Sequence, residues 1–153
     1  CIRDSFKLCK TFIHLQNKKK KLFNMGVFDN LFNNKNKIVN ETFINWIPLI
    51  NIEDLDVIYE LSKKESILIF KHSTRCGISR MVIKEFEKLF SEETKKIKIY
   101  YLDLLEHRNI SNEVGNYFKV VHESPQLIIV RNGTVIEHSS HYDITQTNLS
   151  RFL

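Results

Sequence analysis

From Phe43 onward, short apolar runs alternate with segments whose apolar residues recur every three or four positions. The runs have the length of strands, and the periodic segments have the length of helices. Strands that alternate with helices form a mostly parallel sheet with helices on its faces, because a crossover between parallel strands needs a helix. We therefore predict an α/β fold with a mixed central sheet flanked by helices, in the order β-α-β-α-β-α-β-β-α.

Particular residues set the expected boundaries. Pro48 cannot donate to a strand ladder, which places the first strand at a sheet edge. Asn51 is the predicted cap of the first helix. Asn132-Gly133 predicts a tight hairpin between the last two strands. The expected strands are 44–50, 66–71, 97–103, 126–130 and 134–138. The expected helices are 51–62, 76–90, 109–118 and 144–152. The apolar stripe of the second helix is expected to consist of Ile78, Val82, Phe86 and Leu89.

The positive charge of the chain is concentrated in its first 40 residues. The formal net charge is +5, and residues 1–40 hold nine lysines and arginines against two acids, whereas residues 41–153 carry a net charge of −2. Because a nucleic-acid-binding domain needs a basic surface on its folded part, we expect no nucleic-acid partner. No run approaches the ~18 apolar residues of a membrane span, so we expect no membrane partner either.

Residues 1–43 are expected to form a basic, disordered leader ahead of one folded domain over residues 44–153. The sequence begins with Cys1, and Met25, followed by Gly26, is a second plausible start of translation. Lysines follow the short apolar stretch of the leader, which is the reverse of the order in a secretory signal. Two interpretations of residues 1–24 stay open: a stretch that is not translated, or a basic arm.

Cys76 is the one cysteine at a predicted junction between a strand and a helix. The other two, Cys1 and Cys9, lie in the leader, which argues against a disulfide framework and for a reducing compartment. A core cysteine would lie on an apolar stripe inside an element, whereas Cys76 follows the polar loop His-Ser-Thr-Arg. We therefore favour a reactive thiol over a structural one.

A reactive thiol must be stabilised as a thiolate. The helix dipole contributes about 0.3–1 kcal/mol, which is less than one pKa unit, so hydrogen bonds must supply the rest. We expect these from the N–H groups of Ile78 and Ser79, with additions from the Ser79 hydroxyl and the Arg75 cation. Gly77 leaves space for a partner sulfur. Ser79 stands where a second cysteine would complete a Cys-x-x-Cys pair.

The segment His-Glu-Ser-Pro-Gln, 122–126, is the second candidate element of the site. We predict a cis bond between Ser124 and Pro125, which would present the Ser124 backbone to a substrate at Cys76; a trans proline at the start of an edge strand is the alternative. His72 and His122 are further candidate substrate-binding residues at this end of the sheet. No histidine spacing matches a zinc site, so we expect no metal.

These residues resemble a known family. The element order, Cys76-x-x-Ser79 and Ser124-Pro125 are similar to the thioredoxin fold. More closely, F-K-H-S-T-R-C-G-I-S, H-E-S-P-Q-L and S-H-Y-D-I-T resemble the bacillithiol-system redox proteins (the YtxJ family, a monothiol bacilliredoxin-like group) over about residues 44–150.

The resemblance implies a cytoplasmic thiol–disulfide oxidoreductase that removes bacillithiol from S-bacillithiolated client proteins. Cys76 would be the attacking cysteine, and Pro125 the cis-proline. Bacillithiol, a low-molecular-weight thiol, would be the co-substrate, with no tightly bound cofactor. We expect a monomer.

Two alternative functions stay open. Cys76-Gly77-Ile78-Ser79, with Lys71 upstream, is similar to the Cys-Gly-Phe-Ser signature of monothiol glutaredoxins, which bridge an iron–sulfur cluster between two protomers with glutathione. Against this, S-S-H-Y-D stands where those proteins carry a Gly-Gly-Cys-Asp type segment. The second alternative is a non-catalytic thioredoxin-like docking module in which Cys76 is only structural.

Overall fold

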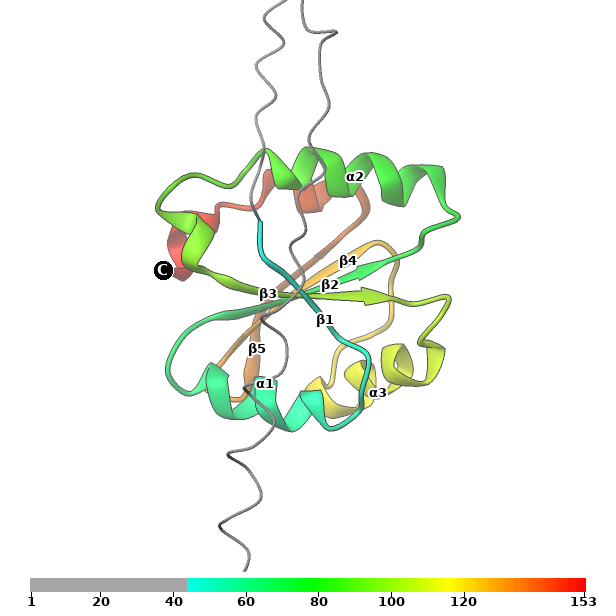
Figure 1. Ribbon diagram of the computed structural model, residues 1–153, viewed down its shortest axis with the longest axis vertical. Helices are drawn as coiled ribbons and strands as arrows, with labels where there is room; N and C mark the ends of the chain where they lie inside the picture. Colours follow the sequence, from blue (N-terminus) through cyan, green and yellow to red (C-terminus); the bar gives the residue numbers. More distant parts are fainter. Residues whose placement is uncertain (1–43) are drawn as a thin grey trace, which may run out of the picture. The chain divides into compact units, whose positions relative to one another are not determined.

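The computed structural model of the protein describes residues 44–153, in which five strands form one sheet (Figure 1). The predicted leader, 1–43, lies outside these residues. Strands β1, β3 and β2 are parallel, and β4 is antiparallel to both β2 and β5, so the prediction of a mixed sheet is confirmed. The strands, in spatial order, are β1 (Trp46–Pro48), β3 (Lys98–Asp103), β2 (Ile67–His72), β4 (Gln126–Arg131) and β5 (Thr134–Ser140).

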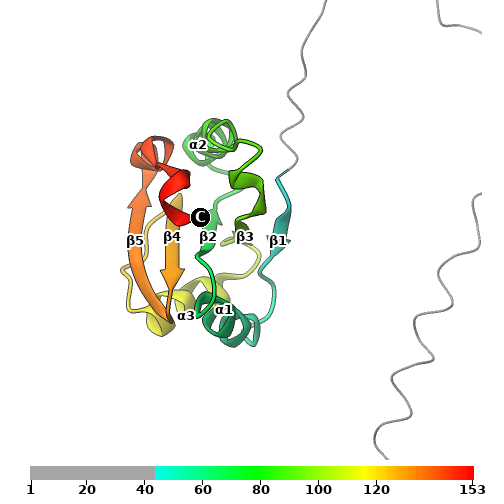
Figure 2. The same cartoon turned by 90° about the vertical axis from the view of Figure 1, so that its left-hand side faces the viewer.

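Helices cover both faces of the sheet. In Figures 1 and 2, α2 lies on one side of the strands, and α1 and α3 lie on the other. Three short 3-10 helices complete the secondary structure of residues 44–153. The bounds are α1 (Asp54–Ser62), α2 (Gly77–Glu87), α3 (Arg108–Phe118), η1 (Thr94–Lys96), η2 (His141–Gln146) and η3 (Leu149–Phe152). Within the part of the chain described here, no helix has the length and apolar character needed to cross a membrane.

Strand β2 is the centre of the core, and all six of its residues are buried. Its side chains alternate between the two faces. Ile67 and Ile69 pack in the cluster that includes α1 and α3, while Leu68 and Phe70 pack in the cluster that includes α2. The alternation continues into the polar end of the strand, so Lys71 lies on the α1/α3 face and His72 on the α2 face.

The hairpin between β4 and β5 confirms the Asn-Gly prediction. Asn132 and Gly133 have φ values of 52° and 74°, the left-handed conformation that such a turn requires. Their N–H groups donate to the carbonyl and the hydroxyl of Ser62, at 2.7 Å and 2.8 Å. The hairpin is thereby attached to the end of α1.

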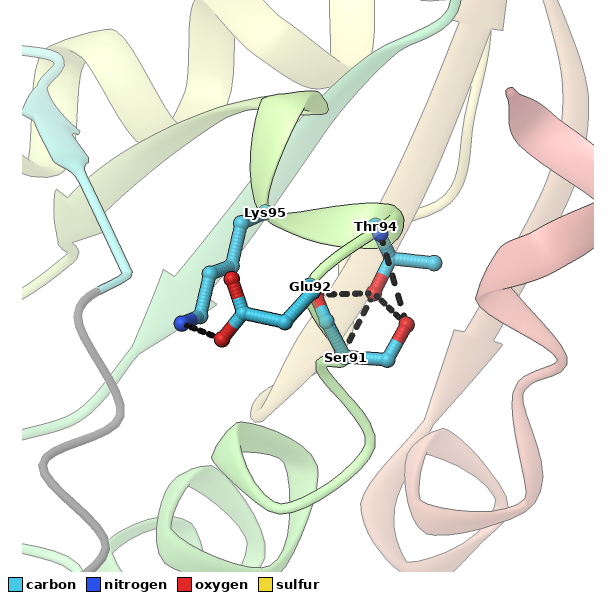
Figure 3. Close-up of polar contacts among 4 residues, drawn as sticks. All are labelled: Ser91, Glu92, Thr94 and Lys95. Carbon is cyan, nitrogen blue, oxygen red and sulfur yellow. Dashed lines mark hydrogen bonds and ion pairs between the residues drawn. The ribbon is translucent and has the colours of Figure 1, made fainter.

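A compact polar turn connects α2 to β3 (Figure 3). The Ser91 N–H donates to Thr94 Oγ1 at 2.7 Å, and the Thr94 N–H donates to Ser91 Oγ at 3.4 Å. These reciprocal bonds satisfy the N–H of Thr94, which begins η1, and the N–H of Ser91, three residues before it. An ion pair between Lys95 and Glu92 lies beside them.

Three local predictions were wrong. Asn51 does not cap α1, which begins at Asp54; instead, the Asn51 N–H donates to the Asp54 carboxylate at 3.1 Å. Ile78 leaves the expected apolar stripe, since its side chain is 57% exposed. The predicted last helix is split into η2 and η3, because Asn148 is extended and its side chain caps η3 by accepting from the Ser150 N–H.

Candidate active site

Cys76 lies at the junction between β2 and α2. It is the N-cap residue of α2, with an extended backbone and a partly exposed free thiol. Its N–H donates to the Ser73 carbonyl at 3.1 Å, and its own carbonyl accepts the first helical bond, from the Arg80 N–H, at 3.1 Å. The sulfur therefore belongs to the positive end of an eleven-residue helix, as the junction predicted.

The immediate neighbours of Cys76 leave its surface open. A Cβ added at Gly77 would meet no atom within 4 Å, and Ile78 and Arg75 are both exposed. This agrees with the expectation that Gly77 leaves space for a partner sulfur. Stabilisation of a thiolate by the N–H groups of Ile78 and Ser79, or by Arg75, stays a prediction.

Ser79 faces the interior. Its side chain is fully buried, and its Oγ accepts from the Ser73 N–H at 3.1 Å and lies 2.8 Å from His72 Nδ1. The hydroxyl thus contacts the loop and His72, and its contribution to the stabilisation of a Cys76 thiolate stays a prediction. Ser79 joins the end of β2 to the first turn of α2.

His72 is a buried partner of Ser79. The residue is 4% exposed. Burial lowers its pKa, the Asp103 carboxylate acts in the opposite direction, and Arg80 lowers the pKa further. The ring is buried and contacts the Ser79 hydroxyl; a contact between His72 and a substrate stays a prediction.

The Ser124–Pro125 bond is cis, as predicted. The Pro125 carbonyl accepts from the His141 N–H at 3.0 Å, and Ser124 is partly exposed. The next residue, Gln126, pairs with Lys71 in the antiparallel ladder. Since Lys71 lies near the end of β2, this register places the cis-proline segment at the same end of the sheet as Cys76.

Lys71 and His122 form a pair that sequence reasoning missed. Lys71 is fully buried, and its Nζ lies 2.7 Å from His122 Nδ1 and 3.2 Å from the Ser111 carbonyl oxygen. Within the described part of the chain, Lys71 forms no ion pair with a carboxylate. The available signal was a lysine at the end of a continuous apolar strand, but nothing in the pattern pointed to its partner.

The charges of this pair follow from its surroundings. Burial lowers the pKa of Lys71 to about 8. The pKa of His122 is also lowered, first by burial and then by the charges of Lys71 and Arg108, with Glu123 acting in the opposite direction. Near neutral pH the pair is therefore an ammonium that donates to a neutral imidazole. Within residues 44–153, no three His, Cys, Asp or Glu side chains are grouped to hold a metal ion.

The lowered pKa of Lys71 predicts a change of stability with pH. Between about 8 and the ordinary value of 10.5, the Lys71 side chain is more fully protonated in the unfolded chain than in the folded one. The contribution of Lys71 to the free energy of unfolding should therefore rise with pH through this window, by about 3 kcal/mol. The free energies of unfolding of wild type and Lys71→Met, measured by urea titration below and above this pH window, isolate the effect of Lys71. The two proteins have all their other titrating groups in common.

The matched control for this prediction is Lys84→Met, which removes an exposed lysine of α2. We expect the Lys84→Met protein to keep the wild-type pH profile and the Lys71→Met protein to lack the contribution of Lys71, so that its difference from wild type grows with pH across the window. Parallel profiles for wild type and Lys71→Met would contradict the assignment of a depressed pKa to Lys71.

Comparisons with known proteins agree with this architecture. A family model described as monothiol bacilliredoxin BrxC matches residues 47–149. A solved thioredoxin-fold structure assigned as an oxidoreductase is 28% identical, with a TM-score of 0.59, over 69% of this chain and 90% of that one. Thioredoxins of Malassezia sympodialis and Trypanosoma brucei brucei are 20% and 17% identical, with TM-scores of 0.56 and 0.58, over 70% and 71% of this chain and 90% of each of theirs. The predicted thioredoxin-like fold is thus confirmed.

Proposed function

Because the chain belongs to the monothiol bacilliredoxin family, we propose that it removes bacillithiol from S-bacillithiolated proteins. One observation carries the proposal: a partly exposed free thiol, Cys76, begins α2 at the cis-proline end of the sheet, and a serine occupies position 79. The partners are client proteins that carry bacillithiol and a low-molecular-weight thiol, and the reducing cytoplasm is the compartment in which such a thiol stays active.

The first step is a thiol–disulfide exchange. The Cys76 thiolate attacks the bacillithiol sulfur of the mixed disulfide, so that a bond forms between Cys76 and bacillithiol while the bond to the client breaks. The client leaves as a thiolate and takes a proton from solvent. One disulfide replaces another, and no external reductant is consumed.

The second step needs a thiol from outside the chain. Ser79 has no sulfur with which to displace bacillithiol from Cys76, and its hydroxyl is turned toward His72. A second low-molecular-weight thiol, or a reductase, therefore attacks the adduct and is oxidised as Cys76 is restored. The serine makes this a monothiol cycle.

The test is transfer of bacillithiol between two purified proteins. Reduced protein is mixed with a client that carries one bacillithiol mixed disulfide, and intact masses are followed with peptide mapping. We expect the client to lose its adduct while Cys76 gains one that reductant removes. A client that stays modified, with Cys76 unmodified, would overturn the proposal; the cluster-carrier and docking alternatives both predict that result.

Ser79→Cys should convert the site to a dithiol. The new thiol lies one helical turn from Cys76 and should displace bacillithiol by forming an internal disulfide with Cys76, seen as the loss of two hydrogens in the intact mass. The same change removes the hydrogen bonds of Ser79, at a net cost of roughly 0.5–1.5 kcal/mol each.

Ser79→Ala is the control, because it loses the same hydrogen bonds without gaining a thiol. In the Ser79→Ala protein, we expect release of bacillithiol from Cys76 to require an external thiol, as in wild type. In the Ser79→Cys protein, we expect this release to proceed without one. If Ser79→Cys forms no internal disulfide and depends on external thiol as before, the monothiol account of position 79 is wrong.

A further inference from the structure

His122 is an exposed residue held by buried polar side chains. Lys71 contacts its ring at Nδ1. Gln126 braces the backbone on both sides of it: Gln126 Nε2 donates to the Val121 carbonyl at 2.8 Å, and the Glu123 N–H donates to Gln126 Oε1 at 3.3 Å. Both Lys71 and Gln126 are fully buried, and they are neighbours in the β2–β4 ladder.

Burying the polar side chains of Lys71 and Gln126 costs free energy, and this cost argues that the His122 segment they hold has a role. Burying an amine and an amide removes them from water, and the cost is recovered only through the bonds they make. Here several of those bonds end on the His122 segment rather than within the core. Buried side chains that fix the orientation of an exposed polar residue are typical of the support around a binding site.

The contact with Lys71 also fixes the proton of the ring. An ammonium has only donors, so Nδ1 must accept, and the proton of the neutral imidazole lies on Nε2. Protonation of both nitrogens would set two donors against each other 2.7 Å apart, which agrees with the lowered pKa of His122. Within residues 44–153, Nε2 has no hydrogen-bond partner, and it lies on the edge of the ring away from Nδ1.

We propose that Lys71 and Gln126 are positioning residues that present the Nε2–H of His122 to a carboxylate of the low-molecular-weight thiol. The cations of Lys71 and Arg108 favour an anionic ligand at this point, with Glu123 as the opposing charge nearby. His122 lies three residues before the cis-proline, at the end of the sheet that carries Cys76. The inference rests on the proposed function and assigns the ligand group that this part of the site recognises.

The test combines kinetics with a spectroscopic readout on the full chain. His122→Phe keeps a ring and removes the donor, while Lys71→Met removes the contact that orients it. Each protein is assayed with one client carrying either bacillithiol or cysteamine, which has no carboxylate. We expect both variants to raise KM for the bacillithiolated client about tenfold or more, with kcat unchanged, and to leave KM for the cysteamine adduct unchanged.

The spectroscopic readout is the imidazole ¹⁵N signal of His122, assigned by its absence from His122→Phe. We expect the Nε2–H form in wild type and a mixture of the two neutral forms in Lys71→Met, which a purely structural role of the lysine would not produce. Lys84→Met is the control for loss of one positive charge and should match wild type in both readouts. Because His122 is exposed, His122→Phe decides the kinetic question even if Lys71→Met fails to fold.

Two failures can be told apart. If wild type leaves the bacillithiolated client unchanged, the proposed function is overturned. If wild type is active but His122→Phe has the wild-type KM, or shifts KM equally for both adducts, only the carboxylate contact is overturned. A wild-type ring that carries its proton on Nδ1 overturns the positioning role of Lys71.

Discussion

Replacing Cys76 with serine is expected to reduce transfer of bacillithiol to the rate measured without protein. The thiolate is the nucleophile in disulfide exchange, and a serine hydroxyl cannot take its place. The loss will not reflect unfolding. Cys76 is partly exposed and occupies the N-cap of α2 with an extended backbone, a position where serine is among the preferred residues. Client release, measured by intact mass, should therefore be lost. The free energy of unfolding, measured in urea, should stay close to that of wild type.

The matched control removes the other two cysteines. A variant carrying Cys1→Ser and Cys9→Ser keeps Cys76 as its one thiol and should retain wild-type transfer and a single adduct. If Cys76→Ser still accepts bacillithiol at the wild-type rate, or if the double variant loses activity, the assignment of Cys76 as the acceptor is wrong.

Replacing Phe86 with alanine is expected to lower the free energy of unfolding by about 3–5 kcal/mol. Phe86 is fully buried on α2. Its ring centroid lies 5.1 Å from that of Phe70 in β2, and 6.3 Å from that of Trp46 in β1. It therefore attaches the helix that carries Cys76 to the sheet. Urea unfolding followed by fluorescence measures the effect directly, because Trp46 is the single tryptophan of the chain.

Met81→Ala is the control for Phe86→Ala. Met81 is on the same helix but is 51% exposed, so the change should stay within about 0.5 kcal/mol of wild type. A loss for Phe86→Ala no larger than that for Met81→Ala would contradict the assignment of Phe86 as the anchor of α2.

The parts of the fold that the sequence predicted are those specified by short-range pattern. A continuous apolar run identified β2, and the spacing of Ile110, Val114 and Phe118 identified the buried face of α3. Asn132-Gly133 identified the hairpin because few residues accept the backbone conformation of its turn. The candidate thiol followed from the same reasoning, since a junction between strand and helix is visible in the order of neighbouring residues.

The sequence pattern predicted the wrong helix boundaries at two places where a polar side chain forms a hydrogen bond with a nearby backbone N–H group. The Asn148 side chain accepts from the Ser150 N–H and divides the predicted last helix into two 3-10 turns. Likewise, the Asp54 carboxylate binds the Asn51 N–H, and α1 starts later than expected. Asparagine and aspartate bind nearby backbone groups in several ways, and periodicity does not distinguish among them.

The partners of the polar residues at the site depended on tertiary structure. Lys71 and His122 are 51 residues apart in the chain, and they meet because β4 pairs with β2 in one register. The inward direction of the Ser79 hydroxyl depends in the same way on where the alternation of β2 leaves His72. Residue order therefore specifies which segments form strands and helices and where the thiol lies between them. Which side chains then share a proton or a hydrogen bond is decided only when the sheet register brings distant segments into contact.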